Sequence, residues 1–355
     1  MINERISSAR DYLDLSGVEA LIFLGLPNIR YLSGFTGSDG ALVLTQEKGW
    51  FLTDSRYTTQ ALREVAGLEI IEYKVKKDGL AHLLASESIK KVGFEAEHTS
   101  FSFFQALGES LPDVELLPIG IKLDDLRLMK DAEELLLLEK CAAIASKALV
   151  GIMEMIRPGI REREIALELE FAIKRGGADD KAFDFIVASG PRGALPHGKA
   201  SDKTIQTGEL VTIDFGALFC GYHSDETVTI AVGNADERQR EIYSIVKNAH
   251  DKALEALKPG INLKELDGIA RGFIAEKGYS DYFGHGLGHG VGLEVHERPV
   301  VSPRSEQIAQ EGMVFTIEPG IYIPEWGGVR IENTVVVTKD GWRMLTGVPK
   351  DLMIL

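Results

Sequence analysis

The second half of the chain contains an internal repeat, and this feature constrains the fold more than any other. Three short segments occur twice in the same order: Arg157-Pro158-Gly159-Ile160 and Lys258-Pro259-Gly260-Ile261, Thr212–Gly216 and Thr316–Gly320, and Asp225–Val228 and Glu332–Val335. The offset between copies grows from 101 to 104 to 107 residues, as small loop insertions would produce. Because helical patterns flank each Pro-Gly pair, we predict two copies of a helix–helix–hairpin unit, packed as one domain with a pseudo-twofold relation.

The residues before the repeat, 1–122, alternate between short strand patterns and helical patterns. Apolar stretches predict strands at Ala20–Leu24, Ala41–Leu44, Trp50–Leu52, Glu69–Tyr73 and Val92–Phe94. Helical patterns lie at Tyr57–Val65, Leu80–Ile89 and Phe101–Leu111. We therefore expect an α/β (α+β) chain, with a small mixed α/β domain over residues 1–124 and the repeated domain over residues 125–355.

A long helix is predicted at the start of the second domain. Asp131 and Glu134 have the spacing of a capping box, and a run rich in leucine and alanine continues to Ile156. Arg157-Pro158-Gly159 ends the helix, because proline lacks the backbone donor and glycine tolerates the turn.

Composition excludes several classes of function. The formal net charge is −15 and no block of Lys or Arg occurs, so nucleic acid is not an expected partner. No apolar run approaches the roughly 18 residues that a membrane span needs. With only two cysteines, Cys141 and Cys220, we expect no disulfide framework, and a cytoplasmic location is the simplest expectation.

The repeat places an acidic residue at equivalent points of both predicted hairpins. These residues are Asp214, Asp225, Glu318 and Glu332, and they lie in strand segments that contain Ile, Phe and Val. Four carboxylates buried together would repel one another and raise each other's pKa values, whereas two divalent cations would balance the charge. The alternative is that the four acids face solvent on half-exposed strands.

Glycines alternate with other residues in Gly284–Gly292, which contains His285 and His289, and His296 follows soon after. We expect these glycines to let the backbone approach a metal or a substrate closely. A neutral imidazole would add a ligand without charge, although a lone histidine is usually structural. A phosphate loop is the competing interpretation, but no strict G-x-G-x-x-G and no Gly-Lys-Ser/Thr occur.

Oxygen-rich coordination with a single histidine favours Mn²⁺ or Co²⁺, with Zn²⁺ as a further option. A pair of such ions would acidify a bridging water and polarise a carbonyl group, which is the arrangement used for hydrolysis.

The chain resembles the proline-specific pita-bread metallopeptidases, Xaa-Pro dipeptidase (prolidase) and aminopeptidase P, over almost its whole length. The most specific match is His285–Glu297. Asn28–Phe35 and Leu52–Tyr57 resemble the creatinase-like domain of that family. The resemblance implies a pita-bread domain behind a creatinase-like N-terminal domain, and cleavage of the bond between an N-terminal residue and proline by a metal-bridging hydroxide.

The resemblance also implies the metal ligands. Asp214 would bind the first metal ion, and His289 and Glu318 the second. Asp225 and Glu332 would bridge the two ions.

The remaining roles also come from the resemblance. Glu318 would handle the proton of the water, and His197 and His296 would steady the carbonyl oxygen. The residues that would orient ligands and substrate are His285, Tyr322 and Arg330. For Tyr322 and Arg330, simple packing and pairing along a strand is the alternative.

Two departures from the family pattern concern the substrate. Val228 stands where many relatives have arginine, and Val300 stands where several prolidases have the arginine that grasps the carboxylate of the dipeptide. Arg298 and Arg304 are the candidates to replace it. The choice between a dipeptidase and an aminopeptidase for longer peptides therefore stays open.

Other functions on the same scaffold are a creatine amidinohydrolase that works without metal, a methionine aminopeptidase, and a non-catalytic pita-bread binding module. The five intact ligands argue against the first and the last. The resemblance further implies a homodimer, in which the loop Thr36–Gly40 would reach toward the active site of the partner.

Overall fold

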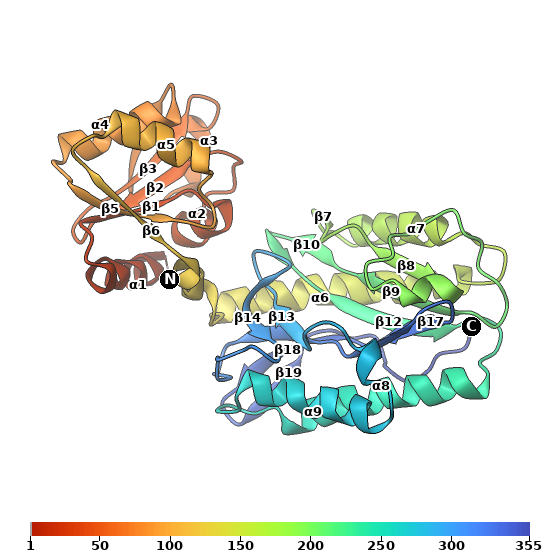
Figure 1. Cartoon of the computed structure of the whole chain (residues 1–355). Helices are drawn as coiled ribbons and strands as arrows, with labels where there is room; N and C mark the ends of the chain where they lie inside the picture. The colour runs from red at the N-terminus through yellow and green to blue at the C-terminus, as the bar shows by residue number, and fades with distance from the viewer. Residues whose placement is uncertain (1) are drawn as a thin grey trace. The chain divides into compact units, whose positions relative to one another are not determined.

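The computed structural model describes residues 2–355, which form two compact units (Figure 1). The first unit ends at Arg127 and the second comprises Leu128–Leu355. Among the described residues, no helix is both long enough and apolar enough to cross a membrane.

The first unit is built on a mixed six-stranded sheet with the order β4-β3-β2-β1-β5-β6. The strands are β1 (Ala20–Phe23), β2 (Ala41–Leu44), β3 (Gly49–Asp54), β4 (Glu69–Tyr73), β5 (Lys91–Glu95) and β6 (Glu115–Ile119). The helices are α1 (Ile2–Ser16), α2 (Leu26–Ser33), α3 (Thr58–Glu64), α4 (Lys76–Ser86) and α5 (Phe101–Ser110). Leucines of α4 and α5 form a buried cluster with side chains of β1, β2, β3 and β5. The strands and helices predicted from the sequence are present, and α1, α2 and β6 are additional.

The first copy of the repeat fills the first half of the second unit. Its helices are α6 (Ala132–Ile152) and α7 (Glu162–Arg175), and the predicted capping box of Asp131 and Glu134 is present at the start of α6. The strands are β7 (Asp180–Lys181), β8 (Ile186–Ser189), β9 (Leu210–Phe215), β10 (Ala217–Phe219), β11 (Tyr222–His223) and β12 (Glu226–Ala231). The main sheet has the order β12-β9-β8.

The second copy follows with α8 (Glu237–Ala256) and α9 (Leu263–Glu276). The strands are β13 (Gly288–Gly290), β14 (Glu297–Val301), β15 (Val314–Ile317), β16 (Gly320–Ile323), β17 (Gly327–Arg330), β18 (Asn333–Thr338) and β19 (Gly341–Met344). The sheet β14-β13-β15-β18-β19 contains β13-β15-β18 as the counterpart of β8-β9-β12. The predicted α/β class with two repeated units is therefore confirmed.

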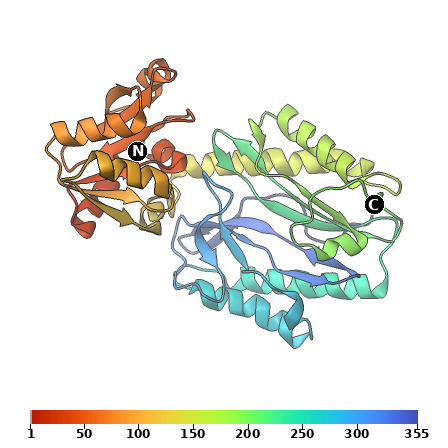
Figure 2. The ribbon, with the colours of Figure 1, turned by 45° about the horizontal axis from the view of Figure 1, so that its top comes forward.

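The strands of the second unit lie between two helix pairs, α6 with α7 and α8 with α9 (Figures 1 and 2). Each pair buries its apolar face in a cluster of its own against the nearest strands. The two copies are joined by hydrogen bonds, because Thr334 Oγ1 donates to Asp225 O at 2.7 Å and Thr227 Oγ1 donates to Glu332 Oε2 at 2.6 Å. The join lies beside the predicted acids, so the repeat itself positions the candidate site.

Candidate metal centre

A cavity of about 740 Å³ opens in the second unit, and all ten side chains predicted for the site line it. They are His197, Asp214, Asp225, His285, His289, His296, Glu318, Tyr322, Arg330 and Glu332. The cavity is also lined by Val300 and Arg304 but not by Arg298. The structure thus brings together residues spread over more than a third of the chain.

The acids lie where the strands of the two hairpins end or begin. Asp214 is the penultimate residue of β9, and Asp225 directly precedes β12. Glu318 directly follows β15, and Glu332 directly precedes β18. Because β9 pairs with β12 and β15 pairs with β18, each hairpin holds its two acids at the same end.

His289 occupies the middle of β13 and faces the carboxylates. Its Nε2 lies 3.4 Å from Glu318 Oε1 and 3.6 Å from Asp225 Oδ2. Ligand atoms of Asp225, His289 and Glu332 all lie within 4.8 Å of one another. Asp225 and Glu332 are only 4% and 2% exposed, so the alternative of solvent-facing acids on half-exposed strands is wrong for these two.

The donor atoms of this cluster fit divalent cations. Asp214 Oδ1 and Asp225 Oδ1 are buried without a hydrogen-bond donor among residues 2–355. The ring contact between His289 Nδ1 and Gly290 O, at 3.1 Å, assigns the proton to Nδ1 and leaves the Nε2 lone pair to face the carboxylates. Buried, unpaired oxygens beside a neutral imidazole form an oxygen-rich ligand set.

The electrostatics lead to the same conclusion. Burial raises the pKa of Asp225 and Glu332 well above the ordinary values, and the neighbouring carboxylates raise both pKa values further. Burial also raises the pKa of Glu318 and lowers the pKa of His289. Without cations, the folded chain therefore carries an electrostatic penalty at this point.

A chain of hydrogen bonds connects Asp214 to three predicted orienting residues. Arg330 Nη2 donates to Asp214 Oδ2 at 2.7 Å, and Arg330 Nη1 donates to the hydroxyl oxygen of Tyr322 at 3.0 Å. The Tyr322 hydroxyl lies 3.0 Å from His285 Nε2. Since His285 Nδ1 lies 2.7 Å from Gly286 O and carries the proton, His285 Nε2 accepts from Tyr322.

His296 and His197 reach the cavity from two loops. The His296 ring lies 4.1 Å from the His289 ring, and burial lowers the pKa of His296 to about 4. His197 is exposed on the segment that follows the short 3₁₀ helix η3 (Gly190–Ala194). At neutral pH, the His296 imidazole is therefore uncharged.

Three glycines of the Gly284–Gly292 segment, Gly284, Gly286 and Gly288, line the cavity, and the segment also packs tightly against its own sheet. A Cβ at Gly288 would lie 1.9 Å from Thr316 O, and one at Gly290 would lie 2.2 Å from Arg298 O. The backbone therefore approaches β14 and β15 closely as well as lining the cavity. The reason is that β13 runs between these two strands at close range.

Threonines that contact the acids were absent from the predicted site. Thr227 Oγ1 donates to Glu332, and Thr316 Oγ1 lies 3.2 Å from Glu318 Oε1 and accepts from the His289 N–H at 3.0 Å. The signal was available, because a threonine lies two residues after Asp225 and two residues before Glu318.

Comparison with known proteins places this geometry in context. The family model described as metallopeptidase family M24 matches residues 137–339, and the creatinase/prolidase N-terminal domain matches residues 5–129. The chain is 43% identical to the Xaa-Pro dipeptidase of Pyrococcus horikoshii, over 99% of both chains. The structure superposes on an Xaa-Pro dipeptidase from Bacillus anthracis with a TM-score of 0.98, at 42% identity and full coverage of both chains. It superposes on an X-Pro aminopeptidase from Thermotoga maritima with a TM-score of 0.90, at 37% identity and 99% coverage of both.

Proposed function

This chain belongs to metallopeptidase family M24, and on that premise we propose that it hydrolyses the bond between an N-terminal residue and proline. The predicted pita-bread fold with a creatinase-like N-terminal domain is confirmed by the family match and the solved neighbours. The observation that carries the proposal is the single cavity lined by all five candidate ligands and by the side chains proposed to act on the substrate. Relatives named Xaa-Pro dipeptidase support the substrate class.

Five residues would hold two divalent cations: Asp214, Asp225, His289, Glu318 and Glu332. Asp214 would serve one ion, His289 and Glu318 the other, and Asp225 and Glu332 both. We propose Mn²⁺ as the bound metal, with Co²⁺ and then Zn²⁺ as the alternatives. The bound ions would supply an acidified water and polarise the carbonyl of the scissile bond.

The chain's own side chains would then move protons and bind oxygen. The Glu318 carboxylate would take the proton of the attacking water and pass it to the departing proline nitrogen. The neutral imidazole of His296 would donate to the carbonyl oxygen as negative charge develops on it, and His197 would donate to the same oxygen. Arg330, held by Tyr322 and itself bonded to Asp214, would fix that ligand's orientation.

We further propose that a dipeptide with a free carboxylate is the preferred substrate. Of the two arginines that line the cavity, Arg330 is bonded to Asp214. Arg304 is exposed, and its guanidinium forms no hydrogen bond or ion pair within residues 2–355. Arg304 would therefore bind the carboxylate at the position where Val300 offers no charge.

Replacing Arg304 by alanine is expected to raise the KM for an Xaa-Pro dipeptide about tenfold with little change in kcat, because one charge-assisted contact is lost. Steady-state kinetics on the dipeptide and on its C-terminal amide measure the effect. The amide lacks the carboxylate, so the variant and the wild type should have the same KM for it. Arg298→Ala is the matched control, and an equal rise in KM for Arg298→Ala would contradict the assignment to Arg304.

The proposed function is tested with purified protein reconstituted with Mn²⁺ or Co²⁺. Xaa-Pro, Xaa-Pro-Yaa and Xaa-Ala peptides are compared under identical conditions. We expect cleavage of Xaa-Pro, slower cleavage of the tripeptide and none of Xaa-Ala. A preference for the tripeptide would favour an X-Pro aminopeptidase, the activity named for the Thermotoga maritima neighbour. No cleavage of either proline peptide would overturn the proposal, and activity that resists chelators would favour a creatine amidinohydrolase type of chemistry.

A homodimer and a cytoplasmic location complete the proposal. The loop Thr36–Gly40 is tied within its own unit, since Thr36 bonds Glu64 and Asp39 accepts from Tyr73 at 2.9 Å. A loop whose side chains are held by such hydrogen bonds suits a role at the active site of a partner. Light scattering of the active protein tests this, and a fully active monomer would refute it.

A further inference from the structure

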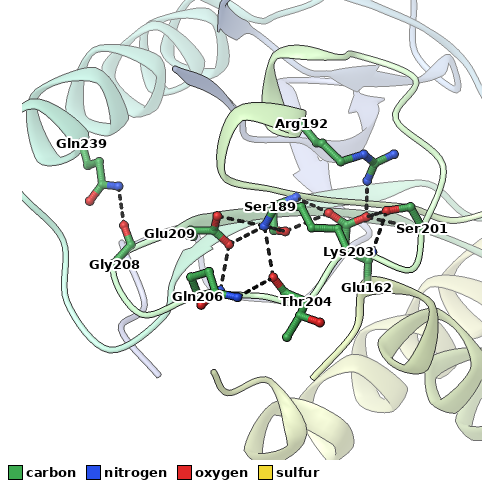
Figure 3. Close-up of polar contacts among 10 residues, drawn as sticks. All are labelled: Glu162, Ser189, Arg192, Ser201, Lys203, Thr204, Gln206, Gly208, Glu209 and Gln239. Atoms are coloured by element: carbon green, nitrogen blue, oxygen red, sulfur yellow. Dashed lines mark hydrogen bonds and ion pairs between the residues drawn. The ribbon is translucent and has the colours of Figure 1, made fainter. Parts of the chain in front are cut away.

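Glu162, the first residue of α7, is a fully buried carboxylate that does not line the cavity. Its side chain accepts five hydrogen bonds. Oε1 accepts from the backbone N–H and the hydroxyl of Ser189, both at 2.8 Å. Oε2 accepts from the backbone N–H of Ser201 at 3.1 Å, from its hydroxyl at 2.6 Å, and from Arg192 Nη1. Figure 3 shows these side chains converging on Glu162.

The two serines mark the two ends of one loop, residues 190–200. Ser189 ends β8, and Ser201 follows the loop, so each carboxylate oxygen of Glu162 holds one end. Arg192 belongs to the loop itself and also donates to Lys199 O at 2.8 Å. Lys203 Nζ donates to the Ser189 hydroxyl oxygen at 2.8 Å and also to the Glu209 carboxylate, which extends the network (Figure 3).

The loop carries two residues of the cavity lining, Pro196 and His197. Pro196 O accepts from Arg330 Nη1 at 3.1 Å, so the loop also touches the residue bonded to Asp214. The His197 side chain is exposed. Its position therefore depends on the backbone of the loop, and the backbone depends on how its two ends are held.

We propose that Glu162 is a positioning residue: it clasps both ends of the 190–200 loop and thereby places His197 at the carbonyl oxygen of the substrate. The inference rests on the proposed function for the role of His197, while the clasp itself rests on the five contacts of Glu162. A glutamine at position 162 keeps the shape but replaces one acceptor oxygen by an NH₂ donor. That donor faces the donors of Ser189 or of Ser201, so one end of the loop is released.

Glu162→Gln is expected to lower kcat for an Xaa-Pro dipeptide by about 10- to 100-fold, since a displacement near 1 Å has effects of this size. The KM should change little, and the two bound metal ions should be retained. The decisive measurement is a double-mutant cycle with His197→Ala. In the His197→Ala background, Glu162→Gln should lower kcat by less than about a further threefold, because the loop then no longer carries the histidine that Glu162 positions. An equal loss of kcat in both backgrounds would overturn the positioning role.

A second measurement needs no substrate. Hydrogen exchange of the amides of Leu195, Gly198 and Lys199, which donate within the loop, should accelerate at least about tenfold in Glu162→Gln. Unchanged exchange would refute the clasp even in an active enzyme. Accelerated exchange in a protein that cleaves no proline peptide would keep the clasp and remove only the proposed function.

Glu134→Gln is the matched control. Glu134 is also buried in the first turn of a helix, and it accepts from the Asp131 N–H and from Tyr222, none of which lines the cavity. It should lower stability while leaving kcat and exchange in the loop unchanged. If Glu162→Gln does not fold, Arg192→Gln removes one donor from a half-exposed position and should give the same cycle with a smaller loss of kcat. Additive losses with His197→Ala would overturn the proposal there too.

Discussion

Replacing Glu332 by glutamine will lower cleavage of Xaa-Pro dipeptides more than about 100-fold, and it will stabilise the metal-free chain. The loss of activity should be larger than the loss caused by replacing a residue that only hydrogen-bonds to a metal ligand. The reason is that Glu332 itself is proposed to bind both ions. The gain in stability has a separate cause. Glu332 is 2% exposed, and burial together with Glu318 and Asp214 raises its pKa.

The sign of the stability change depends on pH. A carboxyl whose pKa is raised by folding does not lower the free energy of unfolding at a pH below its unfolded-state pKa. It lowers the free energy of unfolding increasingly as the pH rises through the folded-state pKa. Urea unfolding in a chelator at pH 7 should therefore give Glu332→Gln a larger free energy of unfolding than the wild type. We expect a gain on the order of 1 kcal/mol, the size that single stabilising substitutions commonly give.

At about pH 3 the gain should vanish, because the carboxyl is then almost fully protonated in both the folded and the unfolded state. Glu134→Gln provides the contrast, since that carboxylate is satisfied by hydrogen bonds and its replacement should lower stability. A metal-free Glu332→Gln protein that is less stable than the wild type at pH 7 would show that the four acids do not repel one another as described.

The second large effect is expected for His296→Ala, which should lower kcat about 100-fold while both metal ions still bind. His296 is neutral at pH 7 because burial lowers its pKa to about 4, so it can donate one N–H to the developing oxyanion. Removal of one such donor costs about 100-fold or more in kcat. Stopped-flow or steady-state rates and metal analysis on the same samples measure both quantities.

His296→Gln is the informative companion variant, because glutamine restores a donor and should recover part of the rate. The ring of His296 also packs against His289, so the alanine variant removes a contact of a proposed ligand. If the loss of activity follows a loss of bound metal, His296 supports His289 and the oxyanion role is contradicted.

Much of this site could be predicted because the repeat is visible in the sequence. Two matched hairpins place the acids at equivalent positions, and hairpin pairing then brings them to one end of each sheet. The first domain was predicted less completely. β6 contains Pro118, which suits an edge strand but weakens a strand pattern, and α2 begins just after Gly25 with Pro27 in its first turn.

Other parts of the site depend on side-chain placement that spacing does not encode. The sequence does not distinguish Arg298 from Arg304 as a ligand for the substrate carboxylate. Only the fold shows that Arg304 lines the cavity. An acidic residue at the start of a helix, such as Glu162, is common because it interacts favourably with the helix dipole. The two serines that bond to Glu162 lie 27 and 39 residues away, so the sequence does not reveal this contact. The tight packing around the glycines of β13 could not be predicted either, because the crowding atoms belong to strands that follow later in the chain.

We propose that Asp214, Asp225, His289, Glu318 and Glu332 together hold two catalytic metal ions. The most direct measurement is a titration of chelator-treated protein with Mn²⁺, in which bound metal and the rate of Xaa-Pro cleavage are determined in the same samples. We predict two ions per chain, no activity without metal, and fewer bound ions with no activity in Glu332→Gln. Full activity without metal, or two bound ions and a normal rate in Glu332→Gln, would contradict it.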